Sequence, residues 1–478
     1  MGNISLACVD GGRVEVDDQL LENFRSNLRG RLLRPGDSDY DLTRKIWNGM
    51  FDKRPALIVS CRGVADIIAS VNFARENRVL LAVRGGGHNV AGNASCDDGL
   101  MIDLSFMKGI WVDRGTAKVR VQGGATWGDV DRETQLFSLA IPGGVVSTTG
   151  VAGLTLGGGM GWQMRKRGLS IDNLISVEIV TADGELKVAS AAENPDLFWA
   201  VRGGGGNFGV VASFEFQAHP VGPIVTLACP MYPADLGEVA LRAWRDFMTT
   251  APEECGGSFL FWSIPNNPFF PEEHHGKPIA IPLITHIGDL EFGERLLDPI
   301  RHLGTPLVDL SGPIPWTMMQ AMFDPFVQAG ALNYYWKSLH LASLDNNVVS
   351  ELVEVATTIP SKNTYLVVLP LGGAFARVAS DETAFGLRDM PFTLELDSMW
   401  PDSSEDELNI EWTRNTWTSL QTYSTGAAYL NFPGFGEDVE NLVRNSVGAN
   451  NYERLRQLKT LYDPTNLFRM NLNIKPSA

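Results

Sequence analysis

The stretch V-R-G-G-G-H-N-V-A-G-N, residues 83–93, decides how the first part of the chain folds. It follows the apolar segment Val79–Val83, which is short enough to be a buried strand. Three successive glycines remove every Cβ from the turn, so that the backbone can take positive φ and a ligand can lie directly on its N–H groups. His88 closes this loop. The same sequence also fits a glycine turn with an ordinary loop histidine and no ligand, so the glycine loop alone is weak evidence for a binding site.

The segments before this loop predict a β-α-β unit. Ala56–Ser60 has the composition of a strand, and Gly63–Asn77 has apolar residues on one helical face. In a dinucleotide-binding Rossmann unit the glycines follow the first strand and a helix begins at once. Here they follow the second strand, which disfavours a Rossmann fold.

Two more segments are dense in glycine: Pro142–Trp162 and Arg202–Gly209. No regular helix tolerates so many glycines. Close packing of backbone explains part of the pattern, and a chain that wraps a long flat ligand explains more of it.

The pattern changes after Pro220 to alternating strands and helices, which predicts an α+β region with one large antiparallel sheet backed by helices. The predicted strands are Ile224–Met231, Ser258–Ile264, Ile279–Ile287, Ala331–Leu341, Thr364–Leu371 and Phe392–Trp400. The predicted helices are Leu236–Thr249, Phe292–Leu303, Asn346–Thr358 and Glu405–Thr422, with one more at Asn451–Leu461 in the tail.

Composition limits the classes of partner. The chain has 478 residues, which predicts more than one domain, and a net charge of −17, which argues against nucleic acid and anionic membranes. No signal peptide or membrane span is visible, and five scattered cysteines fit reduced thiols. We therefore expect a cytoplasmic protein with a small-molecule substrate and no metal site, and the oligomeric state stays open.

Four segments together resemble the berberine-bridge-enzyme-like branch of the FAD-linked oxidases, in its bacterial form, within the vanillyl-alcohol-oxidase superfamily. They are R-G-G-G-H-N at 84–89, G-x-x-G-x-x-L-G-G-G-x-G at 150–161, G-L-S-I-D-N at 168–173 with D-L-F-W-A-V-R-G-G-G-G-N-F-G at 196–209, and N-Y-E-R-L-R-Q-L-K-x-L-Y-D-P-T-N-L-F at 451–468. The resemblance implies an α+β fold with a two-subdomain PCMH-type FAD-binding domain, formed by residues 1–219 and 425–478. Residues 220–424 would form the substrate domain.

The resemblance also implies a cofactor, FAD, bonded through His88 to the flavin 8α-methyl. Many members add a cysteinyl bond, but Val146 stands at that position, so we expect no second bond. Met160 replaces a tyrosine base of many plant members, and Thr149 stands where oxygen access is controlled. The implied cofactor-binding residues are Arg84, Gly85, Gly86, Gly87, His88, Asn89, Gly92, Ser147, Thr148, Gly150, Gly153, Gly157, Gly158, Val211, Asn431 and Asn471.

The catalytic candidates lie on one predicted strand and in the tail. The period of two puts Tyr335, Lys337 and Leu339 on one face of the strand, and related bacterial enzymes place a lysine at the position of Lys337. A lysine at a sheet edge is the alternative for Lys337. Tyr429 is the preferred base or proton relay, with aromatic packing as its alternative, and Asn431 would orient substrate or flavin. His340 is expected to be a packing or surface histidine on the wrong face. Arg377 and Arg388 are expected to be structural, with a substrate carboxylate as the alternative partner of either.

The expected reaction is hydride transfer from an alcohol, sugar or amine carbon to flavin N5, with a base taking the substrate proton and O2 as the electron acceptor. A flavin dehydrogenase with another acceptor, a nicotinamide-dependent dehydrogenase and a non-enzymatic binding protein are the alternatives.

Overall fold

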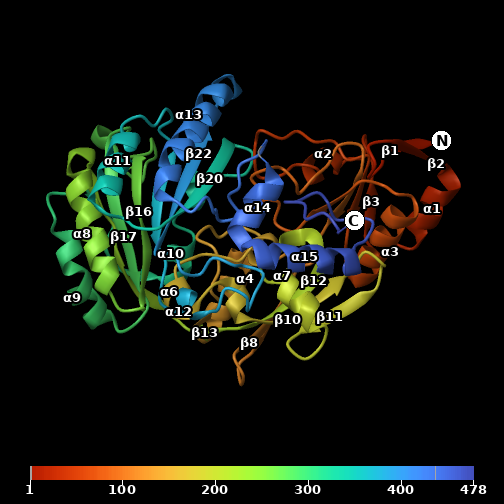
Figure 1. Cartoon of the computed structure of the whole chain (residues 1–478), viewed down its shortest axis with the longest axis horizontal. Helices are drawn as coiled ribbons and strands as arrows, with labels where there is room; N and C mark the ends of the chain where they lie inside the picture. The colour runs from red at the N-terminus through yellow and green to blue at the C-terminus, as the bar shows by residue number, and fades with distance from the viewer. Residues whose placement is uncertain (1–2, 437, 478) are drawn as a thin grey trace.

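Three β-sheets organise the chain, and they surround a common central region (Figure 1). The computed structural model describes residues 3–436 and 438–477. Two of the sheets come from the N-terminal half, and the third and largest comes from the middle of the chain.

The first sheet has the predicted β-α-β unit at its centre. Its strands run in the order β3 (Arg31–Leu33), β4 (Leu57–Ser60), β6 (Leu100–Asp103) and β5 (Leu81–Arg84). The pairs β4–β6 and β5–β6 are parallel, and α3 (Val64–Glu76) crosses over between β4 and β5. The hairpin β1 (Ile4–Ala7) and β2 (Arg13–Val16) and the helices α1 (Asp18–Ser26) and α2 (Tyr40–Thr43) complete this part. Strand β5 ends where the first glycine loop begins.

The second sheet is antiparallel. Its order is β11 (Leu186–Ser190), β10 (Leu174–Val180), β12 (Val210–Gln217), β8 (Lys118–Gln122) and β7 (Ile110–Asp113). Helix α4 (Trp127–Thr134) begins at a capping box, in which Thr126 and Asp129 satisfy each other's backbone N–H. Around this sheet lie α5 (Val151–Leu156), α7 (Pro195–Val201) and, from the other end of the chain, α14 (Val439–Val447) and α15 (Ala449–Tyr462). Side chains of α14 and α15 join the core of this sheet, so the C-terminal tail returns to the N-terminal half (Figure 1).

The third sheet has nine strands. Its main path is β18 (Val308–Asp309), β15 (Pro230–Pro233), β17 (Pro278–His286), β16 (Cys255–Ser263), β21 (Tyr365–Pro370), β22 (Phe392–Trp400) and β20 (Asn333–Leu341), with β14 (Ile224–Ala228) and β19 (Gly312–Pro315) to one side. Four helices pack on one face: α8 (Gly237–Thr250), α9 (Leu290–Arg301), α11 (Asn346–Ala356) and α13 (Asp406–Ser419). The other face packs against the glycine-rich segments. The large antiparallel sheet backed by helices is confirmed, and the domain boundaries after residues 219 and 424 stay predictions.

The segment predicted as one strand over residues 224–231 is two strands. The break falls at Cys229, whose N–H donates to the Ser311 hydroxyl (2.9 Å) instead of to a strand. Pro230 follows and has no N–H to continue the ladder. The elements β18, β19 and α10 (Trp316–Gln320) were not predicted either, because each has only two to five residues and β19 contains two prolines.

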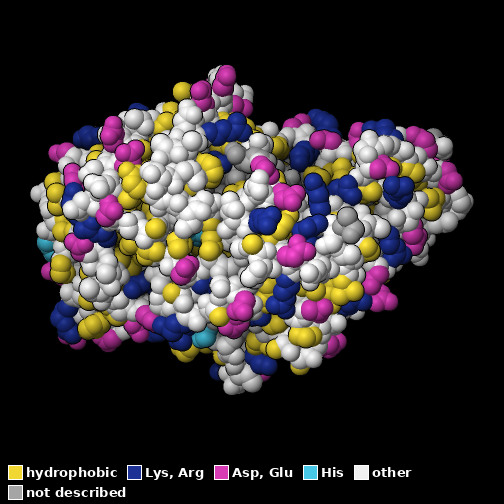
Figure 2. Space-filling view, in the orientation of Figure 1, with side chains coloured by type: hydrophobic (Ala, Val, Ile, Leu, Met, Phe, Trp, Pro, Cys, Tyr) yellow, Lys and Arg dark blue, Asp and Glu magenta, His cyan; other side chains and the backbone are white. Residues whose placement is uncertain are grey.

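The remaining short elements connect the sheets. They are β9 (Leu139–Ala140), β13 (His219–Pro220), α6 (Met164–Arg167) and α12 (Ala374–Arg377). Acidic and basic side chains are interspersed over the face in Figure 2. Within the described ranges, every helix is too short or too polar to cross a membrane.

Candidate active site

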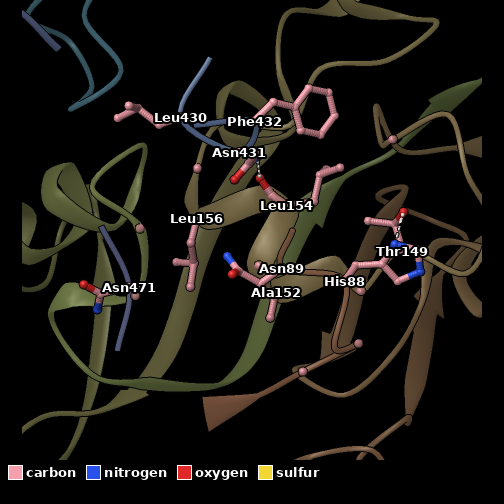
Figure 3. Close-up of a pocket in the computed structure, with 18 of the residues that line it drawn as sticks. His88, Asn89, Thr149, Ala152, Leu154, Leu156, Leu430, Asn431, Phe432 and Asn471 are labelled. Atoms are coloured by element: carbon pink, nitrogen blue, oxygen red, sulfur yellow. Dashed lines mark hydrogen bonds between the residues drawn. The ribbon is translucent and has the colours of Figure 1, made fainter. Parts of the chain in front are cut away.

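A cavity of about 330 Å³ lies where the three sheets and the C-terminal tail meet. Its lining comes from the glycine loops at residues 85–89 and 144–157, from the glycine cluster at residues 203–206, from the face of the large sheet that helices do not cover, and from residues 429–432 and 468–474. Figure 3 shows His88, Leu154, Asn431 and Asn471 around this space, although they come from four separate parts of the chain. The cavity lining is mostly apolar, as in many ligand sites.

The two glycine loops touch through their backbones. A Cβ at Gly86 would lie 2.4 Å from the Cα of Gly150, and a Cβ at Gly150 would lie 2.4 Å from the N atom of Gly86. Real Cβ atoms never approach so closely, so both positions require glycine. Gly153 also lines the cavity, and a Cβ there would meet no atom within 4 Å. The loops therefore offer bare backbone to a ligand.

His88 stands at this junction. Its Nε2 lies 3.0 Å from the Thr148 hydroxyl, and its Nδ1 lies 3.5 Å from the Thr149 hydroxyl. The ring stacks on Trp47, with centroids 4.6 Å apart. Desolvation in the cavity wall lowers the pKa of His88 to about 3, so the imidazole is neutral at physiological pH and keeps a free lone pair.

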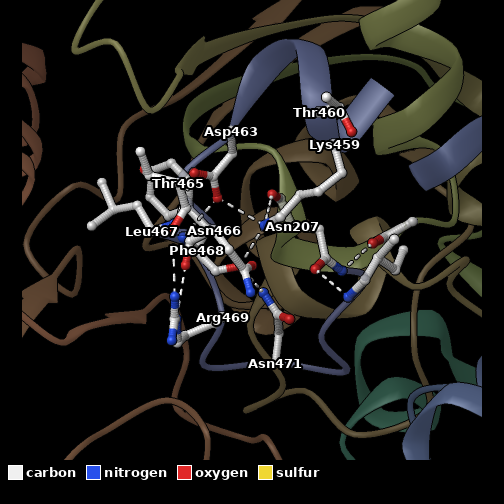
Figure 4. Close-up of polar contacts among 12 residues, drawn as sticks. Asn207, Lys459, Thr460, Asp463, Thr465, Asn466, Leu467, Phe468, Arg469 and Asn471 are labelled. Carbon is white, nitrogen blue, oxygen red and sulfur yellow. Dashed lines mark hydrogen bonds and ion pairs between the residues drawn. The ribbon is translucent and has the colours of Figure 1, made fainter. Parts of the chain in front are cut away.

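The far wall depends on a buried polar cluster around Lys459 (Figure 4). The Lys459 ammonium donates to the Asp463 carboxylate and to the carbonyls of Asn207 and Phe468, each at 2.8 Å. Asp463 also accepts the N–H groups of Leu467 and Phe468. Lys459 and Asp463 are both fully buried. The cluster therefore fixes the tail against the loop at residues 203–207, and both segments line the cavity.

Tyr429 and Asn431 lie side by side in the cavity wall. The Tyr429 hydroxyl oxygen accepts hydrogen bonds from the N–H groups of Gly159 and Met160, both 3.2 Å, and from the Asn431 amide at 2.7 Å. The same amide donates to the Leu154 carbonyl at 3.1 Å. Burial raises the pKa of Tyr429 to about 12, so it is a neutral phenol and a poor base at physiological pH.

Two carboxyl groups that the sequence reading missed line the same cavity. Glu395 and Asp397 are on β22, and each is only 7% exposed. Burial raises the pKa of Asp397 to about 8, and burial together with Asp397 raises that of Glu395 well above its usual range. The sequence F-T-L-E-L-D-S-M-W could have indicated these two residues, because its acids alternate with leucines on a strand that is buried throughout. In β22, Leu394 and Leu396 face the helices and the two acids face the cavity.

The structure places Lys337 away from this site. Lys337 is on the helix-covered face of β20, with its ammonium 3.9 Å from the Trp417 ring of α13, and it does not line the cavity. The face assignment was therefore inverted, because Trp336, on the opposite face of β20 from Lys337, lines the cavity. His340 is buried, as a packing histidine would be.

Most of the expected cofactor-binding residues line the cavity, and the others support it. The lining residues are Gly85, Gly86, Gly87, His88, Asn89, Gly150, Gly153, Gly157, Val211, Asn431 and Asn471. Arg84 is instead bound to Asp103 at 2.9 Å, Gly92 packs on Phe51, Gly158 packs on Phe385, and Ser147 binds Asp324. The Thr148 hydroxyl lies 3.0 Å from His88 Nε2.

Arg388 and Arg377 both form ion pairs within the protein, as expected of structural residues. Arg388 is buried and makes two 2.8 Å hydrogen bonds to Asp172, and Arg377 pairs with Glu253. Neither lines the cavity.

Comparison with known proteins identifies the family. Residues 55–190 match the FAD binding domain family, and residues 428–475 match the family described as berberine and berberine like. An uncharacterized FAD-linked oxidoreductase of Bacillus subtilis is 32% identical over 95% of this chain and 98% of its own length. (R)-6-hydroxynicotine oxidase of Paenarthrobacter nicotinovorans is 28% identical over 95% and 98%. The crystal structure of 6-hydroxy-D-nicotine oxidase from Arthrobacter nicotinovorans superimposes with a TM-score of 0.82 at 26% identity, over 94% of this chain and 98% of that one.

The chain belongs to the FAD-linked oxidoreductases of the berberine-bridge-enzyme-like family, and it is an FAD-dependent oxidoreductase. The cavity fits this cofactor: three glycine segments line it and would offer backbone N–H groups to a pyrophosphate, and Gly153 leaves room for a ligand against the main chain. None of the described lining residues is Lys or Arg.

The first prediction concerns Asp397. Its pKa is about 8 in the folded protein and near 3.8 when unfolded, so the folded state binds the extra proton between these values and loses stability as pH rises through this window. Asp397→Asn should therefore raise Tm over the wild type at pH 8 and have a smaller effect at pH 5. The exposed Asp381→Asn should follow the wild type in calorimetry at both pH values. Equal effects of Asp397→Asn at the two pH values would contradict the raised pKa.

The second prediction concerns Lys459. Lys459→Met leaves Asp463 buried without its cation, which should cost about 3–5 kcal/mol of folding free energy and loosen the tail. We expect faster proteolytic release of the C-terminal residues and a lower flavin-to-protein absorbance ratio. Lys475→Met, at an exposed position of the same tail, should change neither. A variant with native flavin content and native protease resistance would refute the role of the cluster.

Proposed function

We propose that the chain is an oxidase that holds FAD through one covalent bond to His88 and oxidises an alcohol, sugar or amine carbon. The observation that carries the proposal is the neutral His88 ring, fixed between Trp47 and two threonine hydroxyls where the two glycine loops meet. A neutral imidazole has the lone pair that bond formation to a flavin methyl requires. Val146 lines the cavity at the position of the second attachment in other members, and it has no nucleophile.

The residues around the cavity have distinct roles in this proposal. FAD, when bound, accepts the hydride at N5. Glu395 and Asp397 take the proton that leaves the substrate O–H or N–H. Only the ionised form of the pair can accept this proton, and because burial raises the pKa of Asp397 to about 8, the ionised fraction increases as the pH rises towards that value. Tyr429 and Asn431 hold this end of the cavity in shape through their hydrogen bonds to residues 154–160. The apolar and aromatic walls keep water from the reacting carbon.

Oxygen is the proposed electron acceptor, which the oxidase names of relatives support. A flavin dehydrogenase with another acceptor is the second candidate. The nicotinamide alternative has no support among the residues, since the glycine loop follows the second strand of the β-α-β unit.

The third prediction tests the attachment. His88→Ala removes the only proposed link, so its flavin should dissociate into the supernatant on acid precipitation, whereas the wild type should precipitate yellow. His302→Ala, at an exposed histidine of another region, should keep acid-stable flavin. If His88→Ala protein retained flavin after denaturation, the attachment would lie elsewhere.

The fourth prediction tests the acceptor. Enzyme reduced with dithionite under argon and mixed with air-saturated buffer should regain its yellow absorbance rapidly and form one hydrogen peroxide per active site. Stopped-flow absorbance and a peroxidase-coupled assay measure both quantities. Slow recovery in air, together with rapid recovery with a quinone or dye, would favour the dehydrogenase.

A further inference from the structure

Glu395 and Asp397 form a buried carboxyl pair that has no protein partner within the described ranges. No side chain or backbone N–H of those ranges donates a hydrogen bond to either group, and Asp397 Oδ1 is fully enclosed without a partner. Buried carboxyl groups are normally paired or hydrogen-bonded, because leaving them unpaired is costly. A ligand in the cavity is therefore the partner that these groups lack.

Aromatic rings flank the carboxyl pair. In the register of the sheet, Asp397 lies directly between Trp336 of β20 and Tyr365 of β21, and all three line the cavity. Trp336 also contacts the rings of Trp47 and Phe432. A carboxylate between aromatic faces attracts a cation both through its charge and through the ring quadrupoles.

The cavity holds no cation of its own among the described lining residues. Lys and Arg are absent from that lining, and His88 is neutral. The titratable groups that face the pair are the phenols of Tyr365 and Tyr429, whose raised pKa values keep them uncharged. An anionic ligand would oppose ionisation of the two acids, whereas a cationic ligand would favour their ionisation and then meet complementary charge.

We propose that the substrate is a cationic amine, whose ammonium N–H groups donate to Glu395 and Asp397 between the rings of Trp336 and Tyr365. This inference rests on the proposed function and narrows its three substrate classes to one. Since the free pair holds protons at neutral pH, binding of an ammonium group should drive them off, and proton release is a signature that a merely structural pair would not give.

The test uses three small probes with the same skeleton and no oxidisable α-hydrogen. They are 2-phenylpropan-2-amine, 2-phenylpropan-2-ol and 2-methyl-2-phenylpropanoate, titrated into the purified flavoprotein by calorimetry at pH 7 in two buffers of different ionisation enthalpy. We expect the amine to bind at least about tenfold more tightly than the alcohol, because hydrogen bonds to charged groups are worth more than neutral ones. About one proton should be released per amine bound, and the carboxylate should bind most weakly.

The isosteric double variant Glu395→Gln/Asp397→Asn should lose both the preference for the amine and the proton release. The surface variant Glu354→Gln removes one charge from the same region and should keep both. Equal or tighter binding of the alcohol, or an amine preference that survives in the double variant, would overturn the inference. Calorimetry needs no flavin, so protein without acid-stable flavin would count against the proposed function while the amine preference is still measured.

Discussion

The contact between Gly86 and Gly150 is the constraint on which the rest of the site depends. One loop follows β5 and the other precedes α5, and their backbones approach so closely that neither position has room for a Cβ. This contact places His88 beside Thr148 and Thr149, and it leaves a strip of bare main chain along the cavity. A flat dinucleotide can lie against the main chain only where no side chains intervene, and the glycines provide this because they have none.

The large sheet completes the site from the other side. Along β22 the side chains alternate, with leucines packed on the helices and Glu395 and Asp397 turned to the cavity. The tail closes the third side, where Lys459 joins the segments around Asn207 and Phe468. Three distant parts of the chain therefore enclose one space, and the chemistry depends on their meeting.

The elements that carry strong local patterns could be predicted from the sequence. The β-α-β unit before His88 and strand β22 follow from apolar patterning, and β22 has the predicted bounds. The glycine segments indicated a wrapped ligand because no helix or strand explains them. The family resemblance then supplied the cofactor, which patterning alone could not name.

The catalytic candidates on the large sheet could not be predicted reliably, because they depend on which face of that sheet lines the cavity. A period of two separates the faces of a strand but does not say which one is covered by helices, and so Lys337 was assigned to the cavity when it packs on Trp417. For the same reason Glu395 and Asp397 were not predicted as site residues. Their importance follows from their burial without hydrogen-bond partners among the described residues, which the sequence does not show. The short strands β18 and β19 are too brief for any periodicity.

The central claim is that one imidazole holds the cofactor that the glycine loops enclose. Mass spectrometry of the native protein after denaturation and proteolysis tests it most directly. The account predicts a single FAD adduct, on the peptide that contains His88, and an unmodified peptide around Val146. Peptides of unmodified mass throughout, or an adduct on a residue outside the loop at 84–89, would contradict it.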